Sequence, residues 1–278
     1  MSSLLQRATT GFLFVLVIVL GIYGGAITSI LLFAIIDWLC LREFLGLVLS
    51  RNHRRDIVRR VLGIGFGLLP YLFATVLQLN LVPNRESFIA IAAILFFPFV
   101  FISFIYELYT KSDRPFSNVA FIVLAMVYIG VPFGLVPFIA FVDGEYFPNL
   151  IFALLVMNWM NDSGAYLVGS RIGRTPLFPS ISPKKTWEGS LGGMAATLLA
   201  SLLICQVFTE LRLIDWIVLS VIVVVFGSLG DLVESMLKRS VKIKDSGSLL
   251  PGHGGMLDRF DAFIFLLPFA TAYLLLIR

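Results

Sequence analysis

The chain has 278 residues, of which 59% are hydrophobic and 14% are charged, and its formal net charge is +4. Soluble domains average about 45–50% apolar and about 25% charged residues, so this composition excludes an ordinary soluble domain and indicates a membrane protein. A helix needs about 20 residues to cross the hydrocarbon core, so we expect several spans in one compact bundle. Cys40 and Cys205 lie in apolar runs, and we interpret them as core or lipid-facing residues rather than as a disulfide or metal site.

Hydropathy predicts nine membrane-spanning helices. The first apolar run follows Arg7, and we interpret it as a retained helix rather than a signal peptide because further spans follow at once. We therefore expect an all-α, polytopic membrane bundle. It would form a single membrane domain over residues 1–278, with amino-terminal helices in 1–142 and the helices that carry the candidate site in 143–278. The predicted spans are 11–24, 26–49, 61–79, 87–109, 116–142, 150–169, 190–208, 213–231 and 260–277.

The basic residues predict the orientation of these helices. If the amino terminus is cytoplasmic, most of the 21 Lys and Arg residues lie in cytoplasmic loops, as the positive-inside rule requires. The two most elaborate polar loops, 170–189 and 232–259, then face the cytoplasm. We interpret the Arg-rich segment 51–60, which includes His53, as an interfacial orientation signal that attracts anionic lipid headgroups rather than as a catalytic element.

Three ionisable residues, Asp37, Arg42 and Glu43, lie within the second predicted span. Ionisable groups are costly inside a bilayer, so each requires a partner or water. The sequence leaves two interpretations open for them: pairing within the bundle, and contact with a substrate.

The sixth predicted span ends in a polar cluster. Asn158, Asp162 and Tyr166 are spaced four residues apart, so a helix would place them on one face. Polar residues in membrane helices often form hydrogen-bonded patches between helices. A carboxylate at such a position nevertheless favours a functional site.

A second polar segment, 182–189, directly precedes the seventh predicted span. Ser182, Lys184, Lys185 and Thr186 offer hydroxyl and ammonium donors suited to a triphosphate, and the helix amino terminus adds backbone amides. The Gly-x-x-x-x-Gly-Lys-Ser/Thr spacing of a Walker A loop is absent. Charge pattern alone is equally typical of a solvated loop that anchors the helix.

The most polar stretch of the chain connects the last two predicted spans. Asp231, Glu234 and Lys238 share one face if the eighth span continues as a helix, and Asp258 and Asp261 lie three residues apart at the start of the ninth. Carboxylates on adjacent helical turns can share one cation or bracket two. Acids at a helix start are also common as caps.

The loop between these carboxylates carries glycines that allow tight bends and bring backbone amides close to a ligand. His253 lies in this loop, and we favour a loop or phosphate contact for it over metal ligation because Mg²⁺ prefers oxygen ligands.

The order of residues in this stretch resembles the signature of the phosphatidate cytidylyltransferases, also called CDP-diacylglycerol synthases. The segment with Asn161, Asp162 and Tyr166 and the segment 182–189 resemble further motifs of that family. A match with fixed spacings over so many positions is far more specific than a lone glycine motif. The signature residues are Ser235, Lys238, Arg239, Lys244, Asp245, Gly247, Leu250, Pro251, His253, Gly254, Gly255, Asp258, Arg259 and Asp261.

The resemblance implies a nucleotidyltransferase of phospholipid biosynthesis that makes CDP-diacylglycerol and pyrophosphate from CTP and phosphatidic acid with Mg²⁺. It further suggests a homodimer. We expect an integral protein of a bacterial inner membrane, with the site on the cytoplasmic face that the charge pattern predicts, and no nucleic-acid partner. We expect the catalytic residues to be Asp231, Lys238, Arg239, Asp258 and Asp261, with Asp231, Asp258 and Asp261 holding one cation or two. The expected substrate-binding residues are Asn161, Asp162, Ser182, Lys184, Lys185, Thr186, Lys244, His253 and Arg259.

Two other functions compete with this interpretation. A CTP-dependent polyprenol or phytol kinase, in which an alcohol attacks the γ-phosphorus, lacks the complete run from Ser235 to Asp261. A transporter would carry charged or helix-breaking residues at midplane in matching halves, whereas the polar clusters here crowd one membrane face. The Asp-Gly-x-x-Ala-Arg motif of the CDP-alcohol phosphotransferases is absent.

Overall fold

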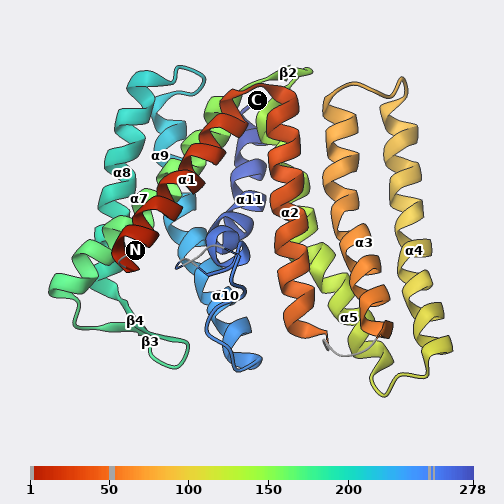
Figure 1. The fold of residues 1–278 in the computed structure, drawn as a ribbon. Helices are drawn as coiled ribbons and strands as arrows, with labels where there is room; N and C mark the ends of the chain where they lie inside the picture. Colours follow the sequence, from red (N-terminus) through yellow and green to blue (C-terminus); the bar gives the residue numbers. More distant parts are fainter. Residues whose placement is uncertain (1–2, 50–53, 250–251, 253) are drawn as a thin grey trace. The chain divides into compact units, whose positions relative to one another are not determined.

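The computed structural model describes residues 3–49, 54–249, 252 and 254–278 (Figure 1). In this part of the chain the structure has nine continuous helical segments and two short β-hairpins, which confirms the predicted all-α bundle. Two of the nine segments contain a π-helical turn. The helical elements are α1 (Ser3–Tyr23), α2 (Ala26–Val48), α3 (Arg54–Gln78), α4 (Arg85–Thr110), α5 (Pro115–Ala125), η1 (Met126–Gly130), α6 (Val131–Ala140), α7 (Pro148–Ile172), α8 (Trp187–Val207), α9 (Leu213–Ile222), η2 (Val223–Gly227), α10 (Ser228–Ser240) and α11 (Leu257–Ile277).

Six helical segments within the described residues are long and apolar enough to cross a bilayer, so the chain is a polytopic membrane protein. Helices α2 and α7 have 23 and 25 residues but contain the polar positions that the sequence singles out. The six apolar segments are Arg55–Gln78, Arg85–Thr110, Pro115–Ala140, Trp187–Val207, Leu213–Ser240 and Leu257–Ile277.

Two predicted boundaries differ from the structure in a way that matters for function. The third helix begins at Arg54 instead of residue 61, so the described part of the Arg-rich segment forms the first turns of α3. Residues 51–53, with His53, lie outside the described residues. The eighth segment continues through α10 to Ser240, nine residues past its predicted end. Hydropathy misses both extensions because the added turns are polar.

The chain forms two compact units. The first unit comprises Met1–Tyr146 together with Ser246–Leu257, and the second comprises Phe147–Asp245 together with Asp258–Arg278. A single membrane domain over the whole chain stays a prediction.

In the first unit, α3 packs against α2, α5, η1 and α6. Helix α3 approaches η1 so closely that a side chain at Gly130 would collide with the backbone of Gly67. The Tyr71 hydroxyl donates to the Ile30 carbonyl at 2.9 Å and links α3 to α2. The hairpin of β1 (Phe141–Val142) and β2 (Glu145–Tyr146) is joined to α1 by the Tyr146 hydroxyl, which donates to the Ile22 carbonyl at 2.8 Å.

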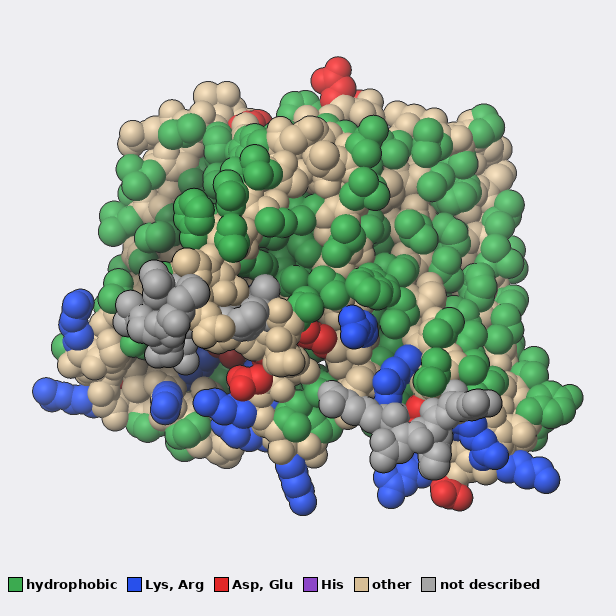
Figure 2. Space-filling view, viewed as in Figure 1, with side chains coloured by type: hydrophobic (Ala, Val, Ile, Leu, Met, Phe, Trp, Pro, Cys, Tyr) green, Lys and Arg blue, Asp and Glu red, His purple; other side chains and the backbone are tan. Residues whose placement is uncertain are grey.

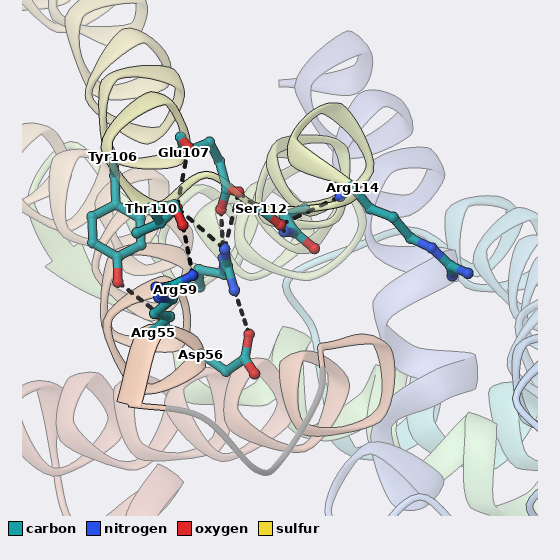
Figure 3. A network of polar contacts seen from close by, with 9 residues as sticks. Arg55, Asp56, Arg59, Tyr106, Glu107, Thr110, Ser112 and Arg114 are labelled. Atoms are coloured by element: carbon teal, nitrogen blue, oxygen red, sulfur yellow. Dashed lines mark hydrogen bonds and ion pairs between the residues drawn. The ribbon is translucent and has the colours of Figure 1, made fainter.

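Helix α4 is held to α3 and α5 by a buried polar network (Figure 3). Arg59 is 5% exposed; it forms ion pairs with Asp56, at 2.6 Å, and with Glu107 of α4. The Asn118 side chain of α5 donates to Glu107 Oε2 at 3.1 Å. Ser103 and Glu107 are buried in α4, which otherwise presents mostly apolar side chains outward. The Arg-rich segment therefore contributes a packing residue in addition to any orientation signal.

The loop that precedes α11 is fastened to α2 by Glu43. Glu43 Oε1 accepts from the Met256 amide at 3.0 Å, and Oε2 accepts from the Leu257 amide at 2.9 Å and the Ser246 hydroxyl at 3.1 Å. A Cβ at Gly247 would lie 2.6 Å from Glu43 Oε1, so this glycine is required for the close approach. The sequence leaves two interpretations open for Glu43, pairing within the bundle and contact with a substrate. In the structure, both carboxylate oxygens of Glu43 are paired within the protein.

In the second unit, α7 and α8 pack with little space between their backbones. A Cβ at Gly164 would lie 2.6 Å from Ala196 Cβ and 2.7 Å from the Gly192 carbonyl oxygen. Small residues allow this close packing in membrane helices, where van der Waals contact drives association. The hairpin of β3 (Pro176–Phe178) and β4 (Ser182–Thr186) connects the two helices.

We predict that Glu107→Ala destabilises the protein by about 3–5 kcal/mol, because it leaves the buried Arg59 without its main counterion. Equilibrium unfolding in mixed micelles measures this loss. Glu86→Ala, at an exposed position in the first turn of the same helix, is the control and should change the unfolding free energy little. Equal stabilities of the two variants would show that the network does not hold α4.

Candidate active site

Three carboxylates of the second unit converge at α10 and α11. Oxygens of Asp231, Glu234 and Asp261 all lie within 4.8 Å of one another. Asp231 and Glu234 are one turn apart on α10, so they share a face. Glu234 is fully buried and Asp261 is 8% exposed. The π-helical turn η2 directly precedes α10, and such turns often occur at functional sites.

Lysine side chains lie beside these acids. Lys238 is paired with Glu234, one turn away on α10, and with Asp258 Oδ1 of α11 at 2.8 Å. Lys185 Nζ lies 2.6 Å from Asp231 Oδ2. The Lys185–Asp231 pair joins β4 to α10, and the Lys238–Asp258 pair joins α10 to α11. Both contacts are charge-assisted.

The cluster contains more carboxyl groups than cationic side chains. The carboxylates of Asp162, Asp231, Glu234, Asp258 and Asp261 outnumber the nearby cations Lys185, Lys238 and Arg259. Within the described residues, Glu234 Oε1 is buried and accepts no hydrogen bond. Buried carboxylates are expensive unless they are paired or bind a metal. The donor set is all oxygen, which suits a hard divalent cation such as Mg²⁺.

The polar end of α7 lies beside this cluster. The Asn161 side chain donates to the Ser228 hydroxyl at 3.4 Å, which connects α7 to the start of α10. Asp162 is within electrostatic reach of Asp231, Lys185 and Arg259. The predicted face with Asn158 and Tyr166 is divided in the structure, because Asn158 is 2% exposed whereas Tyr166 is 74% exposed.

The hairpin before α8 places Lys185. The Thr186 hydroxyl accepts from the Gly189 amide at 3.1 Å and caps α8. Glu188, in the first turn, accepts from the backbone amides of Arg174 and Thr175 at 3.1 Å each. These contacts fasten both ends of the hairpin to the start of α8, next to Lys185, whose ammonium group lies beside Asp231. Thr186 thus has a structural role that the sequence interpretation as a phosphate ligand did not include.

Most of the other predicted site residues lie outside this set of contacts, whereas Arg259 is within electrostatic reach of Asp162. Ser182 is half-buried on β4, and Lys184, Arg239, Lys244 and Arg259 are exposed. In the described part of the chain, no ion pair joins Lys184, Arg239 or Lys244 to the acid cluster. Leu250, Pro251 and His253 lie outside the described residues.

Glu234 is the acidic residue that the sequence analysis left out of the predicted metal ligands, although its spacing from Asp231 was recognised. Asp258, which was included, is instead paired with Lys238 at 2.8 Å. The three-residue spacing on a helix could have identified Glu234 if the end of α10 had been known. The helix was predicted to end at residue 231, before Glu234.

Comparison with known proteins supports the resemblance. A family described as "Cytidylyltransferase family" matches residues 5–277. The chain is 45% identical over 166 residues to the phosphatidate cytidylyltransferase of Bacillus subtilis (strain 168), covering 59% of this chain and 61% of the relative. It is 41% identical over 177 residues to the protein of that name from Staphylococcus epidermidis (strain ATCC 35984), and 40% to that of Staphylococcus aureus (strain COL). Each of these two alignments covers 63% of this chain and 66% of the relative.

These alignments thus span slightly less than two thirds of the length of each relative. The family match, in contrast, extends over nearly the whole sequence and includes every carboxylate and lysine of the cluster described above. The chain belongs to the cytidylyltransferase family.

Proposed function

We propose that this protein is a phosphatidate cytidylyltransferase, which converts CTP and phosphatidic acid into CDP-diacylglycerol and pyrophosphate. The observation that carries the proposal is the convergence of Asp231, Glu234 and Asp261 in the part of the chain that holds the family signature. The names of the similar bacterial proteins support the choice of substrates.

In the proposed reaction, an oxygen of the phosphatidate phosphate attacks the α-phosphorus of CTP. The bond from the α-phosphorus to the oxygen that bridges to the β-phosphorus breaks, and that oxygen leaves with pyrophosphate. A phosphate monoester has its second pKa near ~6 and is largely a dianion at neutral pH, so no strong general base is required. The main task of the protein is to bring two polyanions together and to stabilise the charge of the leaving group.

We assign this task to the charged residues of the second unit. Asp231, Glu234 and Asp261 would hold a divalent cation, which we propose to be Mg²⁺. When bound, such a cation neutralises and aligns the triphosphate. Lys185 and Lys238 would contact phosphate oxygens, and Asp258 would orient Lys238.

The remaining sequence-predicted residues keep their assignments as proposals. Asp258 was predicted as a third metal ligand, and its pairing with Lys238 favours the orienting role instead. The residues proposed to contribute to substrate binding or catalysis are Asn161, Asp162, Ser182, Lys184, Thr186, Arg239, Lys244, His253 and Arg259.

We further propose nine membrane crossings with the amino terminus in the cytoplasm of a bacterium, at its inner membrane. In each unit, hydrophobic side chains cover most of the length of the helices, and Lys and Arg side chains gather at one end (Figure 2). The positive-inside rule would place that end in the cytoplasm, where CTP is available. A homodimer, which family resemblance implies, also stays a proposal.

The metal proposal predicts different effects for neighbouring acids. Glu234→Gln and Asp261→Asn should raise the Mg²⁺ concentration for half-maximal activity by at least about tenfold, because an amide cannot supply the lost negative charge. Asp258→Asn should lower kcat without shifting the Mg²⁺ requirement. Turnover over a Mg²⁺ titration measures both effects, and Glu210→Gln, at an exposed position, is the control. An unchanged Mg²⁺ requirement in Glu234→Gln at matched thermal stability would remove Glu234 from the metal site.

A second prediction concerns Lys185. Lys185→Ala should raise the KM for CTP about tenfold or more, because a charge-assisted phosphate contact is lost. Stability should change little, since both partners of the Lys185–Asp231 pair are partly exposed. Steady-state kinetics with CTP varied at saturating phosphatidate measures the effect, with Arg171→Gln as the control. A CTP KM equal to that of the wild type would leave Lys185 with only a structural role.

The proposed orientation predicts the outcome of reporter fusions. Fusions after residues 112, 180 and 245 should report a cytoplasmic location, and fusions after residues 84 and 146 should report an external one. Alkaline phosphatase and green fluorescent protein fusions read the two sides independently. An external result after residue 245 contradicts the proposed access of CTP to the site.

A further inference from the structure

The first unit contains a mixed polar and apolar pocket that is lined by none of the residues assigned above to the transfer reaction. Its volume is about 690 Å³, within the range typical of ligand sites. Helices α2 and α3 and residues 246–249 form its walls. Arg42 and Arg60 supply its positive charge, and Leu39, Ile57, Val61 and Ile64 supply apolar surface.

The two arginines lie at a depth that suits a lipid headgroup. Arg42 is six residues before the end of α2, and Arg60 is six residues after the start of α3, which places both about 9 Å from the helix ends. Leu39 and Ile64 lie about one turn further along their helices. The pocket is therefore charged near the membrane surface and apolar toward the membrane interior, as a lipid molecule is.

The charge of Arg42 is not compensated by Glu43, the acidic residue of the pocket. Both oxygens of Glu43 accept from donors of the loop, at 2.9–3.1 Å. Among the described residues, Arg42 forms no ion pair, and its guanidinium group lies over the ring of Trp38, 5.7 Å from the centroid. The guanidinium of Arg42 can therefore bind an anion that enters the pocket.

We propose that this pocket binds the phosphate monoester headgroup of phosphatidate, with Arg42 and Arg60 as the ligands of the phosphate. Guanidinium groups match phosphate oxygens with two parallel hydrogen bonds. A monoester phosphate carries about −1.5 to −2 charges at neutral pH, which suits two arginines, whereas a diester carries only one. The acyl chains would lie along Val61, which is 63% exposed, and along the half-buried Leu39 and Ile64. This assignment rests on the proposed function.

Part of the pocket wall, Gly247, also belongs to the signature of the family. Ser246 and Gly247 line the pocket, and the same loop runs on to Asp258. Glu43 fixes both ends of this loop on α2 through Ser246, Met256 and Leu257. Glu43 thus acts as a positioning residue for the pocket, and the loop joins the lipid pocket to the acidic residues in sequence.

Lipid binding without CTP tests the pocket separately from the reaction. Native mass spectrometry of the detergent-solubilised full chain would measure adducts with phosphatidate, with the anionic diester phosphatidylglycerol and with inorganic phosphate. We expect the wild type to select phosphatidate over phosphatidylglycerol. Arg42→Gln and Arg60→Gln should each weaken phosphatidate binding about tenfold or more, while Lys111→Gln, an exposed charge in the same unit, should leave it unchanged.

Kinetics provide the second measurement. In mixed micelles, Arg42→Gln and Arg60→Gln should raise the half-saturating mole fraction of phosphatidate about tenfold and leave the KM for CTP within twofold of the wild type. Selective phosphatidate binding by a wild type that forms no CDP-diacylglycerol would overturn the proposed function and support the pocket. Equal binding of phosphatidate and phosphatidylglycerol, or binding of inorganic phosphate that lipid does not displace, would overturn the pocket. Unaltered lipid binding in both arginine variants, at wild-type thermal stability, would also overturn it.

Discussion

The burial of several carboxylates in one apolar helix bundle is the constraint on which the second unit depends. A buried charge costs several kcal/mol unless it is paired, so a cation beside the fully buried Glu234 stabilises the charged form of this residue. Lys238 supplies this cation and also contacts Asp258, which joins α10 to α11. The acids still exceed the lysines in number. This excess suits the binding of a divalent cation, which in turn attracts phosphate groups.

Helix geometry brings these charged residues together in one site. Helix α10 continues to Ser240, so Asp231, Glu234 and Lys238 project along one face toward the start of α11. Close packing of α7 on α8 holds Asp162 near the same acids, and the cap at Thr186 fixes Lys185. Each contact is local, but together they bring side chains from distant parts of the sequence within reach of one ligand.

The first unit uses its buried charges differently. Arg59 is compensated by Asp56 and Glu107 and serves packing, whereas Glu43 is satisfied by backbone amides and a hydroxyl of the signature loop. Arg42 lies over an aromatic ring at the edge of a pocket, where its charge is available to a ligand. The three ionisable residues Arg59, Glu43 and Arg42 therefore have distinct roles, which follow from what each one contacts.

The sequence alone determined the membrane class, the helical segments and the stretch that carries the chemistry, because hydropathy and motif spacing are local properties. It identified Asp231 and Asp261 as candidate metal ligands for the same reason. Only the tertiary structure placed Glu234 with these acids and paired Asp258 with Lys238, since these choices depend on where α10 ends and how α11 packs on it. The partners of Glu43 lie more than two hundred residues away, so no local pattern could have revealed them.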